Sequence, residues 1–141
     1  MASLGKQPEA GSGPTPAASS SRSALPADIE AKDYQVGDCF TDFDSNASKA
    51  RAVECTTPHS AQLGAVFHYK ANDGFPGTNA LRDKGREVCR TMMLNEAKNK
   101  YTLLQQNVYP SSTSWERGDR RLDCFIVVDS GNTLKESVLQ K

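Results

Sequence analysis

Residues 120–129, RRLDCFIVVD, are the most strand-like stretch of this 141-residue chain, since apolar and β-branched side chains dominate them. Successive side chains of a strand point to opposite faces of a sheet. Leu122, Cys124, Ile126 and Val128 therefore share one face. The stretch predicts a central strand that directs one cysteine toward whatever element covers its apolar face.

The preceding segment predicts that covering element. Residues 79–100, NALRDKGREVCRTMMLNEAKNK, follow a potential N-cap at Thr78 and carry apolar side chains at helical spacing. The expected apolar stripe consists of Leu81, Val88, Cys89, Met92, Met93 and Ala97. Gly85 lies on the same stripe, so the helix is expected to approach the sheet closely there. The pattern predicts one long helix whose Cys89 faces the sheet.

Shorter strand patterns surround these two elements. They cover residues 34–40, 51–55, 61–70 and 101–110, with a loop at 111–114 and a short strand or helix at 134–140. In the 61–70 strand, alternation places Leu63 on the same face as Ala65 and Phe67. The predicted fold class is α+β: a small antiparallel sheet with one main helix packed on one face and two disulfides.

The N-terminal segment has a different composition. Residues 1–32 are rich in Ala, Ser, Pro and Gly and have no aromatic residue. Such a segment buries too little apolar surface to offset its ordering entropy. We predict a disordered linker over residues 1–32 and a folded domain over 33–141. Such a leader before a small domain suggests a membrane or lipid anchor upstream of residue 1.

Charge and motifs exclude several classes of function. Lys and Arg number 17, as do Asp and Glu, and the two signs are interleaved. Binding to nucleic acid needs a clustered basic face, so we expect no nucleic-acid partner and membrane contact only through the missing anchor. No motif for a nucleotide, a catalytic metal or a serine nucleophile occurs, so neither cofactor nor metal is expected.

The four cysteines predict two disulfides. An even count behind a leader of secreted type favours disulfides over free thiols. Four cysteines allow three pairings, and the local geometry favours one of them. Cys39 and Cys55 flank the turn of a potential hairpin, whereas Cys89 on the helix faces the sheet that holds Cys124. We predict the bonds Cys39–Cys55 and Cys89–Cys124.

Cys55 and His59 lie four positions apart in VECTTPHSAQL, residues 53–63. This spacing also suits two zinc ligands, or a thiol nucleophile with its base. Zinc is disfavoured because no C-x-x-C knuckle supplies further ligands. A nucleophile is disfavoured because Cys55 shares a face with the inward Val53. We expect His59 to hold the turn through one ring nitrogen, or to touch a ligand from it.

Three residues near the last strand are further candidates for interaction. Trp115 could be an exposed recognition platform, although a buried ring that pins the loop before the last strand is the favoured interpretation. Asp119 with Arg120 or Arg121 could recognise a carboxylate. The simpler alternative is a turn with Gly118 at positive φ, braced by an Asp–Arg pair.

The spaced pattern VGDCF, VECTTPH, FPG, YP and WERGDR, with Cys89 and Cys124, resembles the septum-formation domain of actinobacterial cell-envelope proteins. The resemblance covers residues 34–138. It implies paired cysteines, an extracytoplasmic location and an association with division or the cell wall, and it implies no known catalytic activity. Family members commonly carry acidic residues where this chain has Ser60 and Gln62.

These observations together predict a non-enzymatic extracytoplasmic envelope module, membrane-anchored in the full-length protein. We expect it to bind another envelope or division protein, or a cell-wall polymer, as a monomer. The candidate interaction residues are His59, Trp115, Asp119 and Arg120. The alternatives are the sensor ectodomain of a membrane signalling protein and a thiol-dependent enzyme that uses Cys55 and His59.

Overall fold

The predicted central strand is β7 (Arg121–Val127), next to the edge of a six-stranded antiparallel sheet. The computed structural model describes residues 24–140. The strand order is β2-β4-β3-β5-β7-β6. The other strands are β2 (Ala27–Glu30), β3 (Cys39–Thr41), β4 (Lys49–Val53), β5 (Ala61–His68) and β6 (Leu104–Val108). The sheet has one main helix and two disulfides, so the predicted fold class is confirmed.

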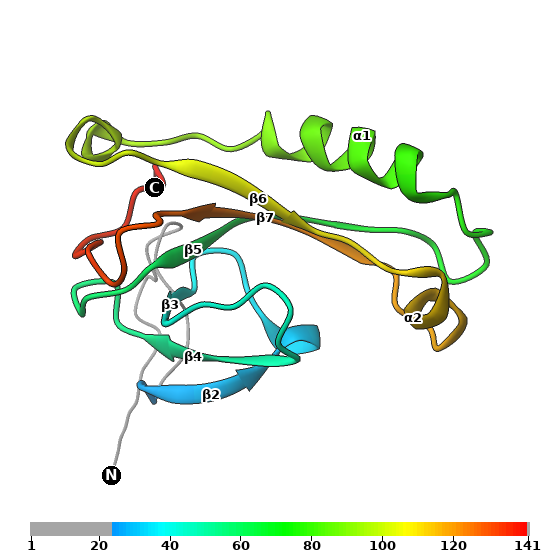
Figure 1. The fold of residues 1–141 in the computed structure, drawn as a ribbon, viewed down its shortest axis with the longest axis horizontal. Helices are drawn as coiled ribbons and strands as arrows, with labels where there is room; N and C mark the ends of the chain where they lie inside the picture. The colour runs from blue at the N-terminus through cyan, green and yellow to red at the C-terminus, as the bar shows by residue number, and fades with distance from the viewer. Residues whose placement is uncertain (1–23, 141) are drawn as a thin grey trace, which may run out of the picture.

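Both faces of β7 are buried, because different elements cover each of them. Helix α1 (Thr78–Cys89) crosses the face that carries Leu122 and Cys124 (Figure 1). On the opposite face, Phe125 packs with Tyr34, Phe40 and Leu63. Figure 1 shows β3, β4 and β2, which form the other half of the same sheet, below β5 and β7 and away from α1. The apolar core is therefore divided by the sheet.

Gly85 brings α1 close to the sheet, as the sequence predicts. A Cβ atom at this position would lie 2.7 Å from Cγ of Asn107 on β6. Asn107 uses the space to donate from Nδ2 to the Gly85 carbonyl at 3.3 Å. The contact fixes the height of the helix above the sheet.

A C-terminal segment without regular structure completes the core. Leu134 and Val138 are fully buried and pack with Ile126 and Val128 of the central strand region. Asn95 holds this segment by donating from Nδ2 to the carbonyls of Ser137 and Leu139. The predicted short strand or helix at 134–140 is thus an irregular segment with two isolated bridges, His59 to Leu134 and Leu94 to Leu139.

The predicted helix is too long. Helix α1 ends at Cys89, and residues 96–100 form a separate 3-10 helix, η3 (Glu96–Lys100). The reason is tertiary: Leu94 pairs with Leu139, and the Asn95 side chain caps η3 by accepting from Ala97 N at 2.7 Å. Met93 is 63% exposed, so it does not belong to the apolar stripe.

Three further predictions need correction. The predicted domain boundary at residue 32 is too late, because Ala27–Glu30 pairs with β4 and 3-10 helix η2 (Ala31–Asp33) follows it. Residues 1–23 of the predicted linker lie outside the described residues.

The predicted loop at 111–114 belongs largely to helix α2 (Ser112–Glu116), which Ser111 caps. A register shift between Leu63 and Ala65 places these two residues in different clusters.

The described part of the chain, residues 24–140, includes no helix with the length and apolar character needed to cross a bilayer.

Candidate functional site

Both predicted disulfides are confirmed. Cys39 on β3 is bonded to Cys55, just beyond β4, with a Cα–Cα distance of 5.3 Å. Cys89, the last residue of α1, is bonded to Cys124 on β7 with a Cα–Cα distance of 5.5 Å. All four cysteines of the chain are therefore oxidised.

The Cys39–Cys55 disulfide leaves Cys55 without the free thiol that both of its chemical alternatives need. A thiolate is required both for nucleophilic attack and for binding zinc. Sγ of Cys55 is bonded to Cys39, so it supplies no thiolate. Across residues 24–140, moreover, no cluster of three or more His, Cys, Asp and Glu side chains has a geometry that would hold a metal ion.

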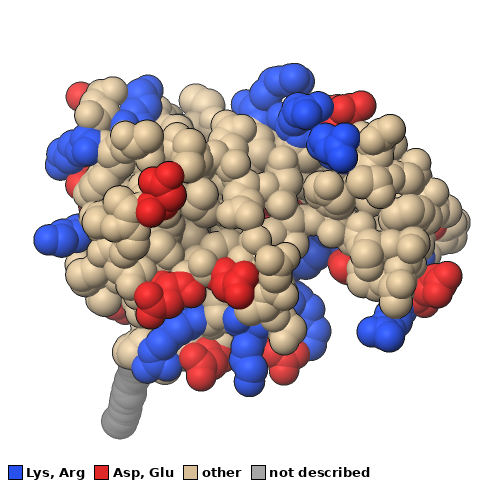
Figure 2. All heavy atoms as spheres, in the orientation of Figure 1, with Lys and Arg blue, Asp and Glu red and all other residues tan. Residues whose placement is uncertain are grey.

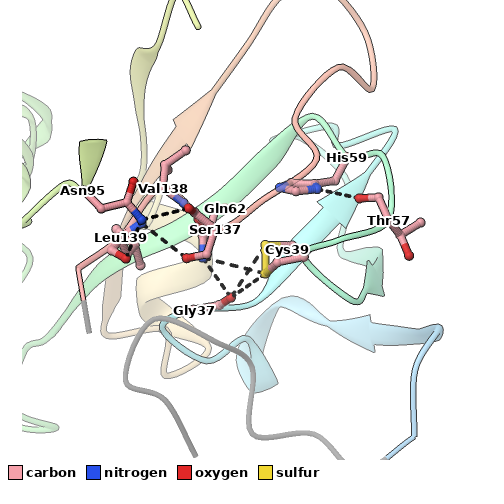
Figure 3. The surroundings of a disulfide bond; sticks show 10 residues. Gly37, Cys39, Thr57, His59, Gln62, Asn95, Ser137, Val138 and Leu139 are labelled. Carbon is pink, nitrogen blue, oxygen red and sulfur yellow. Dashed lines mark hydrogen bonds between the residues drawn. A yellow bond between two sulfur atoms is a disulfide. The ribbon is translucent and has the colours of Figure 1, made fainter. Parts of the chain in front are cut away.

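His59 is fully buried and holds the turn that follows Cys55 (Figure 3). Its Nδ1 lies 2.7 Å from the carbonyl of Thr57, so Nδ1 carries the proton and donates. Its backbone pairs with Leu134, since each N–H donates to the other residue's carbonyl, at 2.9 and 3.0 Å. His59 therefore joins the turn to the C-terminal segment, and its ring does not reach solvent.

Burial lowers the pKa of His59, because the charged ring would lose its hydration. The carbonyls of Thr57 and Glu136 act against this effect. Nε2 has no hydrogen-bond partner within the described chain. A carbonyl only accepts, so the Glu136 carbonyl becomes a partner for Nε2 only when that nitrogen is protonated. At neutral pH the ring is neutral.

Gln62, on β5, is a buried polar residue whose role the sequence does not reveal. Its Nε2 donates to the Gly37 carbonyl at 3.2 Å and to Oγ of Ser137 at 3.0 Å. Its Oε1 accepts from the backbone N–H of Val138 at 2.8 Å. Figure 3 shows the side chain between the disulfide and the C-terminal segment. Gln62 thus replaces the acidic residue of the resemblance with an amide that both donates and accepts.

Trp115 is buried, so the alternative of an exposed recognition platform is wrong. The ring is 5% exposed and lies edge-on to Tyr69 and Phe75, with centroids 5.3 and 5.6 Å away. Its Nε1 donates to the carbonyl of Asp73 at 3.2 Å. Trp115 is therefore buried, as the favoured interpretation predicts, but the loop that its Nε1 holds is the one between β5 and α1.

Arg120 stacks on Trp115 and donates hydrogen bonds to backbone carbonyls. Its guanidinium lies 4.0 Å from the ring centroid, in cation–π geometry. It donates to the carbonyls of Trp115, Asp119 and Ala71. These contacts leave Arg120 poorly placed to bind a carboxylate.

The predicted Asp–Arg side-chain pair does not form at the Gly118 turn. Gly118 has the predicted positive φ, 101°. The Asp119 carboxylate, however, accepts from the backbone N–H of Arg121 at 3.2 Å. The guanidinium of Arg121 pairs with Asp123 on the same face of β7, two residues away, with Nε 2.9 Å from Oδ1. The sequence does carry a signal for this ion pair, since Arg121 and Asp123 are charged residues within the most apolar strand.

Arg121 also ties the N-terminal segment to the sheet. It donates to the carbonyls of Lys32 and Tyr34, both at 3.0 Å. Burial raises the pKa of Asp123, while the adjacent Arg121 lowers it. Burial, and then the charge of Asp123, raise the pKa of Tyr34 to about 12. The Arg121–Asp123 ion pair therefore has little access to water.

This ion pair lies in a groove of about 380 Å³, called here the α2 groove. The groove runs between η2, the end of β6 and α2, and Figure 2 shows a notch between α2 and the lower strands. Its walls combine apolar and charged groups, namely Ala31, Lys32, Val108, Tyr109, Ser114, Arg117, Gly118, Asp119, Arg121 and Asp123. Of the predicted interaction residues, only Asp119 lines it.

Comparison with known proteins gives one match. A family model described as "Septum formation" matches residues 9–124, most of the chain. No curated protein and no solved structure matches the chain. Because the match spans well over half of the sequence, the chain belongs to the septum-formation family.

Proposed function

We propose that this domain is a non-enzymatic extracytoplasmic module of the cell envelope. It binds another envelope or division protein, or a cell-wall polymer, and an anchor outside this sequence holds it at the membrane. Membership of the septum-formation family supports a role in division. Two disulfides support an oxidising compartment, because thiols in the cytosol are kept reduced.

The α2 groove carries the proposal. It combines apolar walls at Val108 and Tyr109 with cationic side chains at its rim, of which Lys32 and Arg117 are exposed. Lys32 is paired with Glu30 and Asp33. Among the described residues, the Arg117 guanidinium has no hydrogen-bond or ion-pair partner, and only its backbone N–H is bonded, to the Ser114 carbonyl. Arg121, in contrast, is committed to Asp123. Concave sites of this kind orient a ligand through a few polar groups on an apolar surface. An extended peptide or a glycan strand that bears a carboxylate suits this combination.

The test is capture with matched variants of the full chain. The immobilised wild type, Arg117→Ser and Arg82→Ser are incubated with detergent-solubilised envelope, and separately with purified cell-wall sacculi. Arg82 is an exposed arginine on α1, outside the groove. We expect Arg117→Ser to lose the bound protein or sacculi and Arg82→Ser to retain them. Equal retention by the two variants would reject the groove as the binding surface.

A further inference from the structure

The two edges of the sheet differ in how they are protected. Exposed strand edges invite pairing with another chain, and charged residues on the edge discourage this. Edge strand β2 has four residues, two of which are the exposed acids Asp28 and Glu30. Edge strand β6, LQQNV, contains no charged residue and no proline. In the part of the chain that the structure describes, β6 is thus the unprotected edge.

The surface around β6 is also poor in charged residues. Figure 2 shows a central area with mostly uncharged residues where Figure 1 places β6, and the charged groups gather around it. Leu104, at the start of β6, is 43% exposed. A partner strand beside β6 would cover this side chain.

Side chains of β6 line hollows at both ends of the strand. Asn107 faces α1, so Leu104, Gln106 and Val108 lie on the opposite face. Val108 lines the α2 groove, where Lys32, Arg117 and Arg121 outnumber Asp119 and Asp123. Leu104 and Gln106 line a second hollow of about 380 Å³, whose charged residues are Asp42 and Asp129; we call it the acidic hollow.

We propose that β6 of a second copy of this chain pairs antiparallel with β6, about a two-fold axis at Gln106. This pairing places Leu104 opposite Val108 of the second copy, so both apolar side chains are covered. It also sets the acidic hollow of each copy beside the net-cationic α2 groove of the other. The surface is therefore complementary to itself, as an isologous interface requires.

The dimer departs from the expectation of a monomer, because the sheet order that exposes β6 is not visible in the sequence. It extends the sheet from one copy into the next and leaves both α1 helices on one face. The α2 groove of each copy continues into the acidic hollow of the other, so each groove is lengthened at the interface. The proposal needs no envelope ligand, and its failure would leave the capture experiment unaffected.

Sedimentation equilibrium of the full chain, over a range of concentrations, tests the proposal. Gln106→Glu and Gln106→Lys each place two like charges opposite one another at the axis. We expect each variant alone to dissociate at about tenfold higher concentration than the wild type. An equimolar mixture of the two places Glu opposite Lys, and we expect it to recover the wild-type association.

Asn72→Glu and Asn72→Lys are the matched controls, since Asn72 is exposed in the loop between β5 and α1. We expect them to associate like the wild type. Gln106 Nε2 donates to Oγ of Ser45 at 2.8 Å within its own chain, so the Gln106 variants also lose this hydrogen bond. The equimolar mixture separates the two effects, because it restores opposite charges at the axis but not the Gln106–Ser45 hydrogen bond. A wild type that stays monomeric at every concentration overturns the proposal. So does a dimer that neither Gln106 variant weakens, or a mixture that fails to recover association.

Discussion

His59 illustrates how a residue that suggests chemistry serves the fold. Its ring is enclosed, its Nδ1 donates to Thr57, and burial lowers its pKa. The unfolded chain therefore binds a proton near the ordinary pKa of 6.5, while the folded chain binds it only at lower pH. Stability linked to His59 is full above pH 6.5 and is lost as the pH falls from 6.5 through the lowered folded pKa.

The prediction for His59 is an altered pH dependence. Urea unfolding between about pH 4.5 and 7.5 should show wild-type stability falling toward acid, and His59→Gln should flatten that slope. His68→Gln is the matched control, because His68 is the only other histidine and is exposed. Asp123 acts in the opposite direction at lower pH, since its raised pKa favours the folded state in acid. A slope that His59→Gln leaves intact would contradict the assignment.

Arg121, like His59, serves the fold, because it pairs with the buried charge of Asp123. Its side chain is 15% exposed and that of Asp123 is 4% exposed, whereas the Arg51–Asp28 pair is exposed, at 51% and 64%. Arg121→Ala leaves Asp123 unpaired and should lower the free energy of unfolding by about 3–5 kcal/mol. Arg51→Ala should lower it by at most about 1 kcal/mol. Similar urea midpoints for the two variants would show that burial of the pair is unimportant.

Helix α1 shows which features of an element the sequence encodes. The apolar stripe, the close approach at Gly85 and the direction of Cys89 follow from helical spacing. The end of the helix does not, because Leu94 and Asn95 are recruited by the C-terminal segment, which is far away in sequence. Strand β2 escapes prediction for the same reason: its partner, β4, supplies the pairing that its weak local pattern does not specify.

The disulfide that ends α1 provides the prediction for this element. Cys89→Ala with Cys124→Ala removes the bond that joins the helix to β7, across a sequence separation of 35. In the chain-entropy model, this should cost about 3–4 kcal/mol in the free energy of unfolding. Urea unfolding measures the loss, and amide exchange should show weaker protection in α1 first. A loss below about 0.5 kcal/mol in the free energy of unfolding would mean that the disulfide does not restrict the conformations of the unfolded chain.

At the scale of the molecule, the sequence predicts the fold class and both disulfides, but only part of the candidate site. His59 holds its turn and Trp115 is buried, as the sequence predicts, but the bond from Trp115 to the loop between β5 and α1 is not foreseen. The α2 groove forms where η2, β6, α2 and β7 meet, so its lining combines residues 31–32 with residues between 108 and 123. No local pattern could assemble it, because the order of strands in the sheet determines which segments become neighbours.

The four cysteines and His59 build a scaffold, so function belongs to the surface of the domain. A peptide map of the protein, digested without reduction and with free thiols blocked, tests this assignment. We expect linked peptides for Cys39–Cys55 and Cys89–Cys124 and no blocked thiol. A blocked Cys55, or a peptide that links it to any cysteine other than Cys39, would overturn the assignment and restore a thiol or metal site beside His59.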